Sequence, residues 1–169
     1  TAQPLIDARR QRFSVTVPPE PVYVEGDLVR LTQVLGNLLN NASKYTGEDG
    51  AIALEVRASE TEVQISVTDD GAGIAPDMLS RVFDLFSQED RTLNRAQGGL
   101  GIGLTLVRRL VQLHGGNDEA RSAGLGRGSQ FLVRLPRLRL PPPPPGEQAD
   151  AKLSRAADAR RVLVVDDNV

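Results

Sequence analysis

The sequence of 169 residues lacks cysteine and tryptophan and contains a single histidine, His114. The absence of cysteine excludes disulfides and thiolate metal sites, and it suits a reducing compartment such as the cytoplasm. No apolar run approaches the ~20 residues that a membrane-spanning helix needs. The formal net charge of −2 provides no broad basic surface for nucleic acid or an anionic membrane. We therefore expect a cytoplasmic domain that contacts neither membrane nor nucleic acid.

Composition divides the chain into three predicted parts. Residues 1–140 carry alternating apolar and polar patterns that are typical of a folded domain. The five prolines at 141–145 cannot enter a helix or a sheet interior, and they open a Pro- and Ala-rich linker that extends to residue 160. Residues 161–169, RVLVVDDNV, form an apolar stretch that ends in acids and is too short to fold alone. We expect this stretch to be the first strand of a second domain.

Hydrophobic periodicity predicts an α+β arrangement for the first part. The predicted strands are residues 13–18, 51–58, 61–69 and 129–136, and the predicted helices are residues 27–45, 76–86 and 104–116. Asp27 is the expected N-cap of the first helix, and the second and third strands alternate with period two, which predicts a hairpin. Because strands and helices mix without regular strand–helix–strand spacing, we expect a mixed sheet with helices packed on one face, an α/β sandwich.

A polar stripe runs along the predicted helix 27–45. It consists of Arg30, Gln33, Asn37, Asn41 and Lys44, which follow one another at helical spacing. Asparagine is a mediocre helix former, so its repeated use asks for a reason. Amide oxygens can ligate a hard cation such as Mg²⁺, and Lys44 can reach an anion. A face that is merely solvated is the alternative, and this stretch alone leaves it open.

An aspartate shares the apolar face of the predicted strand 61–69. Asp69 has the same parity as Val63 and Val67, so its carboxylate is expected to face the core and to need a hydrogen-bond donor. Ser129 shares the apolar parity of the last strand. An acid and a hydroxyl at the rim of an apolar sheet can hold a purine, and the glycines that follow Asp69 let the backbone pass a flat ring closely. An ordinary Asp–Gly turn is the alternative.

A second glycine cluster precedes the predicted helix 104–116. It contains Gly98, Gly99, Gly101 and Gly103. Glycines let the chain wrap an anion, and a helix start offers free N–H groups, so the cluster predicts a phosphate-binding loop. It matches neither a P-loop nor a dinucleotide fingerprint, and a hinge loop is the alternative. The polar residues 87–97 are typical of a lid over a nucleotide, in which Arg91 and Arg95 face phosphate or solvent.

Taken in order, five stretches resemble one family. NLLNNASKYT, DDGAGI, VFDLF, GGLGIGL and GRGSQF resemble the N, G1, F, G2 and G3 boxes of the histidine-kinase catalytic and ATP-binding domain. That family belongs with the gyrase, heat-shock chaperone and mismatch-repair ATPases, which share the Bergerat α/β sandwich. The resemblance covers residues 1–137, and residues 87–116 look especially like hybrid sensor kinases. RRVLVVDDN resembles the opening of a response-regulator receiver domain.

The resemblance implies a metal and phosphate site. It implies that Asn41 is a Mg²⁺ ligand, that Asn37 lies nearby and acts through water, and that Lys44 contacts phosphate, which makes these three the catalytic set. Backbone N–H groups that face the phosphates are implied for Gly99, Gly101, Ile102, Gly103 and Leu104.

The resemblance also implies an adenine site. Asp69 would accept the adenine amine, Gly73 would lie beneath the base, and Tyr45 would lie near the nucleotide. The full set implied around the base is Tyr45, Asp69, Gly71, Gly73, Ile74 and Ser129. Ser129 stands where many relatives carry threonine, a departure that keeps the hydroxyl.

One position separates kinase from ATPase in this family. The hydrolysing relatives carry a glutamate base where this chain has Asn37, and an amide cannot take a proton from water. The resemblance therefore implies a protein-histidine kinase that transfers the γ-phosphoryl group of Mg-ATP. The acceptor would be a histidine in a separate dimerisation domain, of the same or a partner chain, because no His-Glu or His-Asp motif occurs here. The parent is expected to be a homodimer with a receiver domain downstream, and His114 is expected to be structural.

Other functions stay open at this point. A non-kinase ATPase of the same fold is disfavoured by the missing glutamate, and an interaction-only degenerate domain is disfavoured by the intact Asn41, Asp69 and glycines. The VVDD stretch disfavours an anti-sigma-factor kinase.

Overall fold

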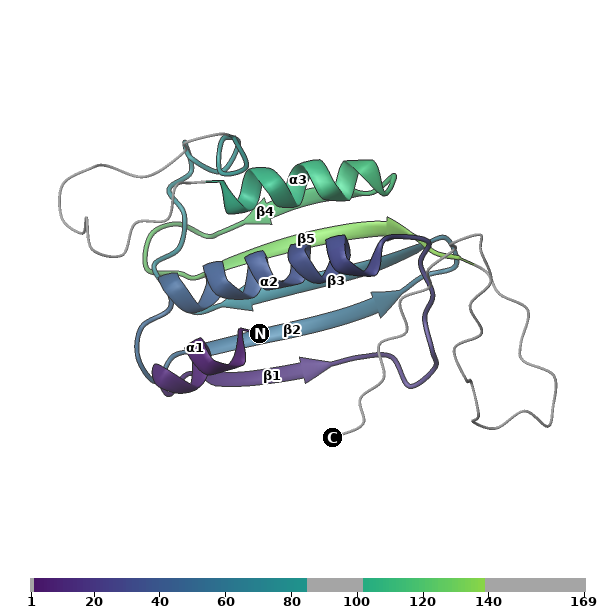
Figure 1. Cartoon of the computed structure of the whole chain (residues 1–169). Coiled ribbons are helices and arrows are strands. Elements are labelled where there is room, and N and C mark those ends of the chain that lie inside the picture. The colour runs from purple at the N-terminus through teal and green to yellow at the C-terminus, as the bar shows by residue number, and fades with distance from the viewer. Residues whose placement is uncertain (1, 85–101, 139–169) are drawn as a thin grey trace.

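The computed structural model describes residues 2–84 and 102–138, which form a layer of strands and a layer of helices (Figure 1). The strands are β1 (Arg12–Thr16), β2 (Ala51–Ala58), β3 (Glu62–Asp69), β4 (Asn117–Arg121) and β5 (Ser129–Pro136). The helices are α1 (Gln3–Ala8), α2 (Leu28–Tyr45) and α3 (Gly103–Leu113). The predicted linker, receiver strand and lid lie outside the described residues. Among the described helices, none is long and apolar enough to cross a bilayer.

The sheet is mixed, and its order is β1-β2-β3-β5-β4. β1 runs parallel to β2, whereas β2–β3, β3–β5 and β4–β5 are antiparallel. All three helices cover the same face (Figure 1). The predicted α+β sandwich is therefore confirmed, together with the hairpin of β2 and β3.

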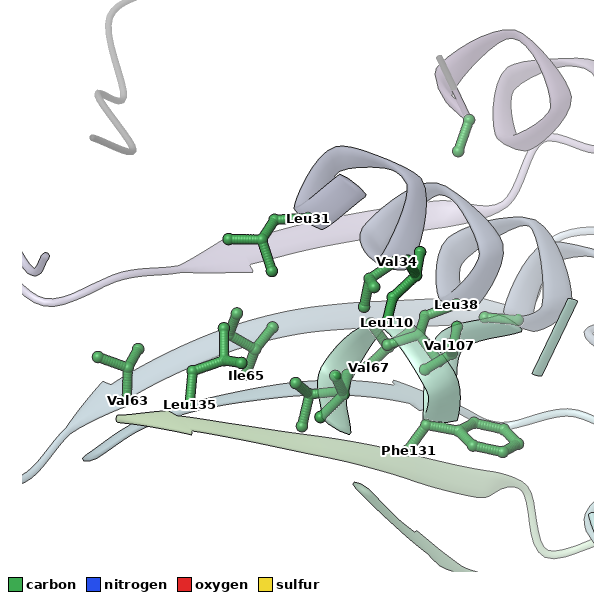
Figure 2. Close-up of a cluster of buried hydrophobic side chains, with 14 of the residues drawn as sticks. Leu31, Val34, Leu38, Val63, Ile65, Val67, Val107, Leu110, Phe131 and Leu135 are labelled. Atoms are coloured by element: carbon green, nitrogen blue, oxygen red, sulfur yellow. The ribbon is translucent and has the colours of Figure 1, made fainter. Parts of the chain in front are cut away.

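The core lies between the sheet and the helices α2 and α3. Figure 2 shows apolar side chains of both helices pointing toward those of β3 and β5. The buried residues include Leu31, Val34 and Leu38 from α2, Val107, Leu110 and Val111 from α3, and Val63, Ile65, Val67, Phe131, Val133 and Leu135 from the sheet. The helical members recur at three- and four-residue spacing and the strand members at every second residue, so each element buries one face.

His114 ties the end of α3 to the start of α2. The predicted N-cap is confirmed, because the Asp27 carboxylate accepts the N–H groups of Val29 and Arg30 at 2.8 and 3.2 Å. The Asp27 N–H in turn donates to His114 Nε2 at 3.1 Å, and His114 Nδ1 lies 2.7 Å from the Leu110 carbonyl oxygen. A carbonyl only accepts, so the proton sits on Nδ1 and both ring nitrogens are used within the fold. This geometry fits the structural role expected of the histidine.

Two glycines, Gly115 and Gly116, close α3. Gly115 has a φ of +68°, and its N–H donates to the Gln112 carbonyl at 3.0 Å. The Gly116 N–H donates to the Val111 carbonyl at 3.0 Å. These two bonds and the left-handed residue make a Schellman motif, which satisfies carbonyls that the helix leaves free.

The predicted helix at 76–86 is wrong over its described part, since residues 76–84 form successive turns. The N–H groups of Met78, Arg81 and Asp84 each donate to the carbonyl three residues earlier, at 2.8–2.9 Å. These are isolated turn bonds rather than the four-residue ladder of an α-helix. Residues 85 and 86 lie outside the described part.

Phe83 explains why apolar residues recur in this segment. Its ring is 3% exposed and meets Phe131 edge-on, with centroids 6.0 Å apart. The Arg108 guanidinium of α3 lies over the Phe83 ring, 4.7 Å from its centroid, and pairs with Asp84 at 3.3 Å. The apolar spacing therefore marks an anchored turn, not a helical stripe.

Two elements carry no strong sequence signal. The strand β4 has the sequence NDEAR, without β-branched or aromatic residues, and is stabilised by side-chain pairs instead. Asp118 accepts from Arg108 at 3.1 Å, and Glu119 accepts from Arg134 at 2.8 Å. The short helix α1 is anchored by Ile6, which is buried against the core.

Candidate functional site

The acid at the end of β3 lies on the inward face, as predicted. Asp69 is 5% exposed and stands opposite Ser129 of β5, which is 9% exposed. The Ser129 hydroxyl donates to Asp69 Oδ2 at 2.5 Å, and the Gly71 N–H donates to Asp69 Oδ1 at 2.9 Å. A carboxylate offers about four lone-pair positions, so this one retains acceptor capacity beyond its two partners.

The turn after β3 is held by backbone contacts with two other segments. The Ala72 N–H donates to the carbonyl of Tyr45 at the end of α2, at 3.0 Å. The Ile74 N–H donates to the Ser122 hydroxyl at 3.0 Å, and the Gly126 N–H donates to the Ala72 carbonyl at 2.6 Å. The surroundings of Asp69 are therefore built before any ligand arrives.

Three glycines around this turn are required by the chain's own packing. A Cβ at Gly71 would lie 2.3 Å from the Tyr45 carbonyl oxygen. Gly73 has a φ of +71°, and a Cβ there would lie 2.1 Å from the Gly124 carbonyl oxygen; Gly128, with a φ of +68°, meets Asp69 in the same way. Such contacts admit no side chain. The expectation that Gly71 and Gly73 also leave room for a flat adenine ring is separate from this packing and stays a prediction.

The polar face of α2 contains an unpaired amide. Asn37, Asn41 and Lys44 are half-buried, whereas Asn40 is exposed on another side of the helix. Asn37 Nδ2 is buried, and none of the residues that the structure describes provides it with a hydrogen-bond partner. A buried polar atom without a partner is uncommon in folded proteins, and it often marks a place where a water, an ion or a ligand binds. The buried nitrogen disfavours the solvated-face alternative at Asn37, and the ligand role of the amide stays a prediction.

The start of α3 lies next to this amide. A Cβ added at Gly103 would meet the Asn37 side chain at 3.7 Å, an ordinary contact. The N-cap, Ile102, has no side-chain acceptor, so the N–H groups of the first turn of α3 have no side-chain cap. Within the described residues, Gly103 and Leu104 thus place N–H groups without a side-chain cap at the positive end of an 11-residue helix. Gly98, Gly99 and Gly101 lie outside the described residues.

Lys44 and Tyr45 complete the end of α2. Lys44 Nζ lies 4.9 Å from the centroid of the Tyr45 ring, a cation–π arrangement. The Tyr45 ring is 47% exposed, so it presents an aromatic surface at the edge of the site. The ammonium is thereby held near the last turn of α2, one turn beyond Asn41.

These groups gather at one end of the molecule. β3 ends and β5 begins there, and the same end holds the last turn of α2 and the first turn of α3 (Figure 1). Two further residues at this end, Arg9 and Gln11, bind carbonyls of the last turn of α2 and are not predicted from the sequence. No local pattern marks them, because their partners lie more than 30 positions away in the chain.

The fold and the site together define a nucleotide-binding α/β sandwich, in which a buried acid lies at the end of β3 and an amide of α2 lies beside the start of α3. Residues 26–139 match the family described as "Histidine kinase-, DNA gyrase B-, and HSP90-like ATPase". The chain belongs to this family, and its matched region is a histidine-kinase ATP-binding catalytic domain.

The relatives come from sensor kinases. Sensor protein SrrB of Staphylococcus aureus (strain NCTC 8325 / PS 47) is 39% identical over 111 residues, which are 66% of this chain and 19% of that protein. The chain thus spans about a fifth of the length of the curated relatives it matches.

Solved structures show the same fold. The mycobacterial sensor histidine kinase MprB has a TM-score of 0.71 at 27% identity, over 82% of this chain and 91% of that one. Full-length ShkA, solved in complex with AMPPNP, has a TM-score of 0.68 at 33% identity, over 80% of this chain and 28% of that one. The neighbours favour the kinase branch of the family over its other ATPases.

Proposed function

We propose that this domain binds Mg²⁺-ATP at the end formed by Asp69, the polar face of α2 and the start of α3. It transfers the γ-phosphoryl group to a histidine of a separate dimerisation domain, in the same or a partner chain. The observation that carries the proposal is the buried Asp69 carboxylate, which is held by Ser129 and Gly71. Burying a carboxylate is costly unless hydrogen bonds compensate, and the exocyclic amine of adenine supplies one more donor.

The phosphate side of the proposed site consists of side chains of α2 and of backbone N–H groups at the start of α3. The amide oxygen of Asn41 suits Mg²⁺, with Asn37 acting beside it through water. The unpaired Nδ2 of Asn37 supports a ligand at this position. Bound Mg²⁺ would neutralise phosphate charge during transfer. Lys44 and the free N–H groups of Gly103 and Leu104 hold the phosphates, by analogy with anion sites at helix starts.

Asn37 also supports transfer rather than hydrolysis. An amide cannot act as the general base for water, so the γ-phosphoryl group stays in place until a histidine nucleophile arrives. Phosphoryl transfer needs positioning and charge neutralisation more than covalent participation by the protein. AMPPNP, with which the relative ShkA was solved, is an ATP analogue and supports a triphosphate ligand here as well.

The wider organisation is proposed from sequence. Residues 1–140 form the catalytic domain, residues 141–160 a linker, and residues 161–169 the first strand of a receiver domain. In this proposal the dimerisation domain belongs to a homodimeric parent, and the need of the catalytic domain for ATP supports a cytoplasmic location.

Calorimetry and a hydrolysis assay on the purified chain test the proposal. We expect one site for Mg²⁺-AMPPNP, and ATP turnover far below the ~10 s⁻¹ typical of enzymes. In the parent protein, label from γ-phosphate should appear as acid-labile phosphohistidine. Fast turnover by the isolated chain would instead support an ATPase, and absence of any nucleotide binding would support an interaction-only domain.

A further inference from the structure

Helix α2 does not end in a left-handed glycine, as α3 does. Its C-cap, Thr46, is extended, with φ −87° and ψ 139°, so the last turn lacks a left-handed residue and the bonds that it would bring. The final carbonyls of a helix have no partner within the helix. The carbonyls of the last helical residues of α2, and that of the C-cap Thr46, must therefore find donors elsewhere.

Two side chains from the segment before β1 supply these donors. Arg9 Nη1 lies 2.7 Å from the carbonyl oxygen of Ser43 and 3.1 Å from those of Lys44 and Thr46. Gln11 Nε2 lies 2.9 and 3.0 Å from the carbonyl oxygens of Ser43 and Thr46. The Ser43 hydroxyl donates back to Gln11 Oε1 at 2.7 Å. We call Arg9, Gln11 and Ser43 the α2 clamp.

The α2 clamp combines a buried pair, Gln11 and Ser43, with the half-buried Arg9. Gln11 is 7% exposed and Ser43 is fully buried, so both side chains of the exchange are shielded from water. Arg9 places a cation at the negative end of the α2 dipole, which stabilises the last turn. The Ser43 and Thr46 carbonyls accept from both donors, whereas the Lys44 carbonyl accepts from Arg9 and not from Gln11. Removing Arg9 therefore takes the side-chain donor from the Lys44 carbonyl and leaves the other two with Gln11, and the loss of a part-buried hydrogen bond is costly.

The clamped turn carries the phosphate side of the proposed site. Lys44 lies inside the clamped stretch, and Asn41 precedes it by one turn. Between the clamped carbonyls, the Tyr45 carbonyl accepts the Ala72 N–H of the turn after β3. The position of the α2 end relative to that turn therefore depends on donors that enter from outside both elements.

We infer that Arg9 and Gln11 are positioning residues for the nucleotide site, which act through the last turn of α2. The inference rests on the proposed nucleotide site. It predicts that the phosphate contact of Lys44 and the Mg²⁺ contact of Asn41 weaken when the clamp is broken, whereas the adenine contact of Asp69 is kept. Because Arg9 and Gln11 follow α1, nucleotide affinity depends on how residues 3–11 pack against α2.

Binding measurements on the full chain test this inference with a matched pair of variants. Arg9→Met removes the guanidinium of the clamp. Arg10→Met removes the neighbouring guanidinium, which is largely exposed and pairs with the exposed Glu48 and Asp49 at 3.3 and 3.4 Å. Calorimetry uses Mg²⁺-AMPPNP and, separately, adenosine, at a temperature where circular dichroism shows each variant folded.

We expect Arg9→Met to weaken Mg²⁺-AMPPNP binding about tenfold and adenosine binding less than about twofold, because a lost charged hydrogen bond is of this size. Arg10→Met should leave both affinities unchanged. Arg9→Lys should restore AMPPNP binding, since an ammonium offers three donors to the three carbonyls that Nη1 serves. Equal losses for AMPPNP and adenosine, or no rescue by lysine, would overturn the positioning role.

Gln11→Met provides a second route if Arg9→Met does not fold. It removes the amide and leaves the guanidinium, and it should show the same selective loss of AMPPNP binding. If neither variant folds, the clamp serves the fold alone and the inference is wrong. If the unaltered chain binds no nucleotide, the proposed function fails instead, whatever the variants do.

Discussion

The two sides of the proposed nucleotide site differ in how complete they are. On the acid side, Asp69 has partners on both carboxylate oxygens, and the following turn is bonded to α2 and to residues 122–128. On the amide side, within the part of the chain that the structure describes, Asn37 has a buried nitrogen without a partner, and the first turn of α3 has no side-chain cap. The carboxylate of the acid side is thus held by the protein on both oxygens and keeps spare acceptor capacity, whereas the amide side presents donors without such partners.

This difference indicates a division of roles. A pre-bonded carboxylate in fixed surroundings can discriminate one base from another, because a wrong ligand leaves a buried polar group unpaired. The donors at the start of α3 and the Lys44 ammonium suit phosphates, whose charge is neutralised by several groups at once. Substitutions on the two sides should therefore fail in different ways.

The largest effect is expected for Asp69→Asn. An amide at this position can still accept from Gly71, but it presents a donor where the adenine amine needs an acceptor. We expect the affinity for Mg²⁺-AMPPNP to fall about 100-fold, since two groups then face each other without a bond. The free energy of unfolding should change little, because the volume is conserved. Calorimetry and urea unfolding measure the two quantities.

Asn40→Ala is the control for this substitution. Asn40 lies on α2 but is exposed and off the polar stripe, so its loss should leave affinity unchanged. Equal losses for Asp69→Asn and Asn40→Ala would contradict the site.

The next largest effects are expected for two glycine substitutions, one on each side of the site, which should differ in the free energy of unfolding of the variant. Gly73→Ala introduces a Cβ 2.1 Å from the Gly124 carbonyl oxygen at a φ of +71°, and we expect unfolding to become easier by about 2 kcal/mol. Gly103→Ala meets only the Asn37 side chain at 3.7 Å, so stability should be kept or gained. Its methyl group lies beside the free donors of α3, and Mg²⁺-AMPPNP affinity should fall severalfold.

Thermal melts with and without nucleotide distinguish these outcomes. A Gly103→Ala variant that unfolds more easily than the unaltered chain would mean that the start of α3 is packed against something other than a ligand. A stable Gly73→Ala variant would show that the turn after β3 can move, and that the acid side is not as rigid as its hydrogen bonds indicate.

The sequence alone predicts the residues of the acid side better than it predicts the contacts that hold them in place. The inward position of Asp69 follows from its parity with Val63 and Val67, and Ser129 follows from the same rule on β5. Both patterns are local. The need for glycine at position 73 is not predictable in the same way, because it arises from a carbonyl at residue 124.

Elements held by side chains from elsewhere are hard to predict from sequence for the same reason. β4 is paired through Asp118 and Glu119, whose arginine partners lie on α3 and β5. The turns of residues 76–84 carry apolar spacing that resembles a helix, but Phe83 is fixed by Phe131 and Arg108. The donors of the α2 clamp are likewise distant in the chain from the carbonyls they bind, and no local pattern indicates them.

The smallest effect is expected far from both sides, at Glu119 on the sheet face that the helices do not cover. Its hydrogen bond with Arg121, and then that with Arg134, lowers the pKa of the Glu119 carboxyl. When the pKa of a carboxyl is lower in the folded than in the unfolded state, its ionised form stabilises the fold at any pH above the unfolded-state pKa. This stabilisation is lost as the pH falls through the folded-state pKa. Because the side chain is 36% exposed, solvent screening limits the gain, and Glu119→Gln should cost about 0.5 kcal/mol or less at pH 7.

Urea unfolding of both proteins from pH 7 down to about pH 4 tests the sign, since the ordinary carboxyl pKa lies near the lower end of this range. The difference between the unaltered chain and Glu119→Gln should begin to close below the ordinary value. Nucleotide affinity should not change, because Glu119 lies on the opposite face of the sheet from Asp69. A difference that widens in acid would assign the opposite sign to the arginine pairs. A change in nucleotide affinity would mean that the open face of the sheet is coupled to the nucleotide site. The comparison of the acid side with the amide side would then have to include that face as well.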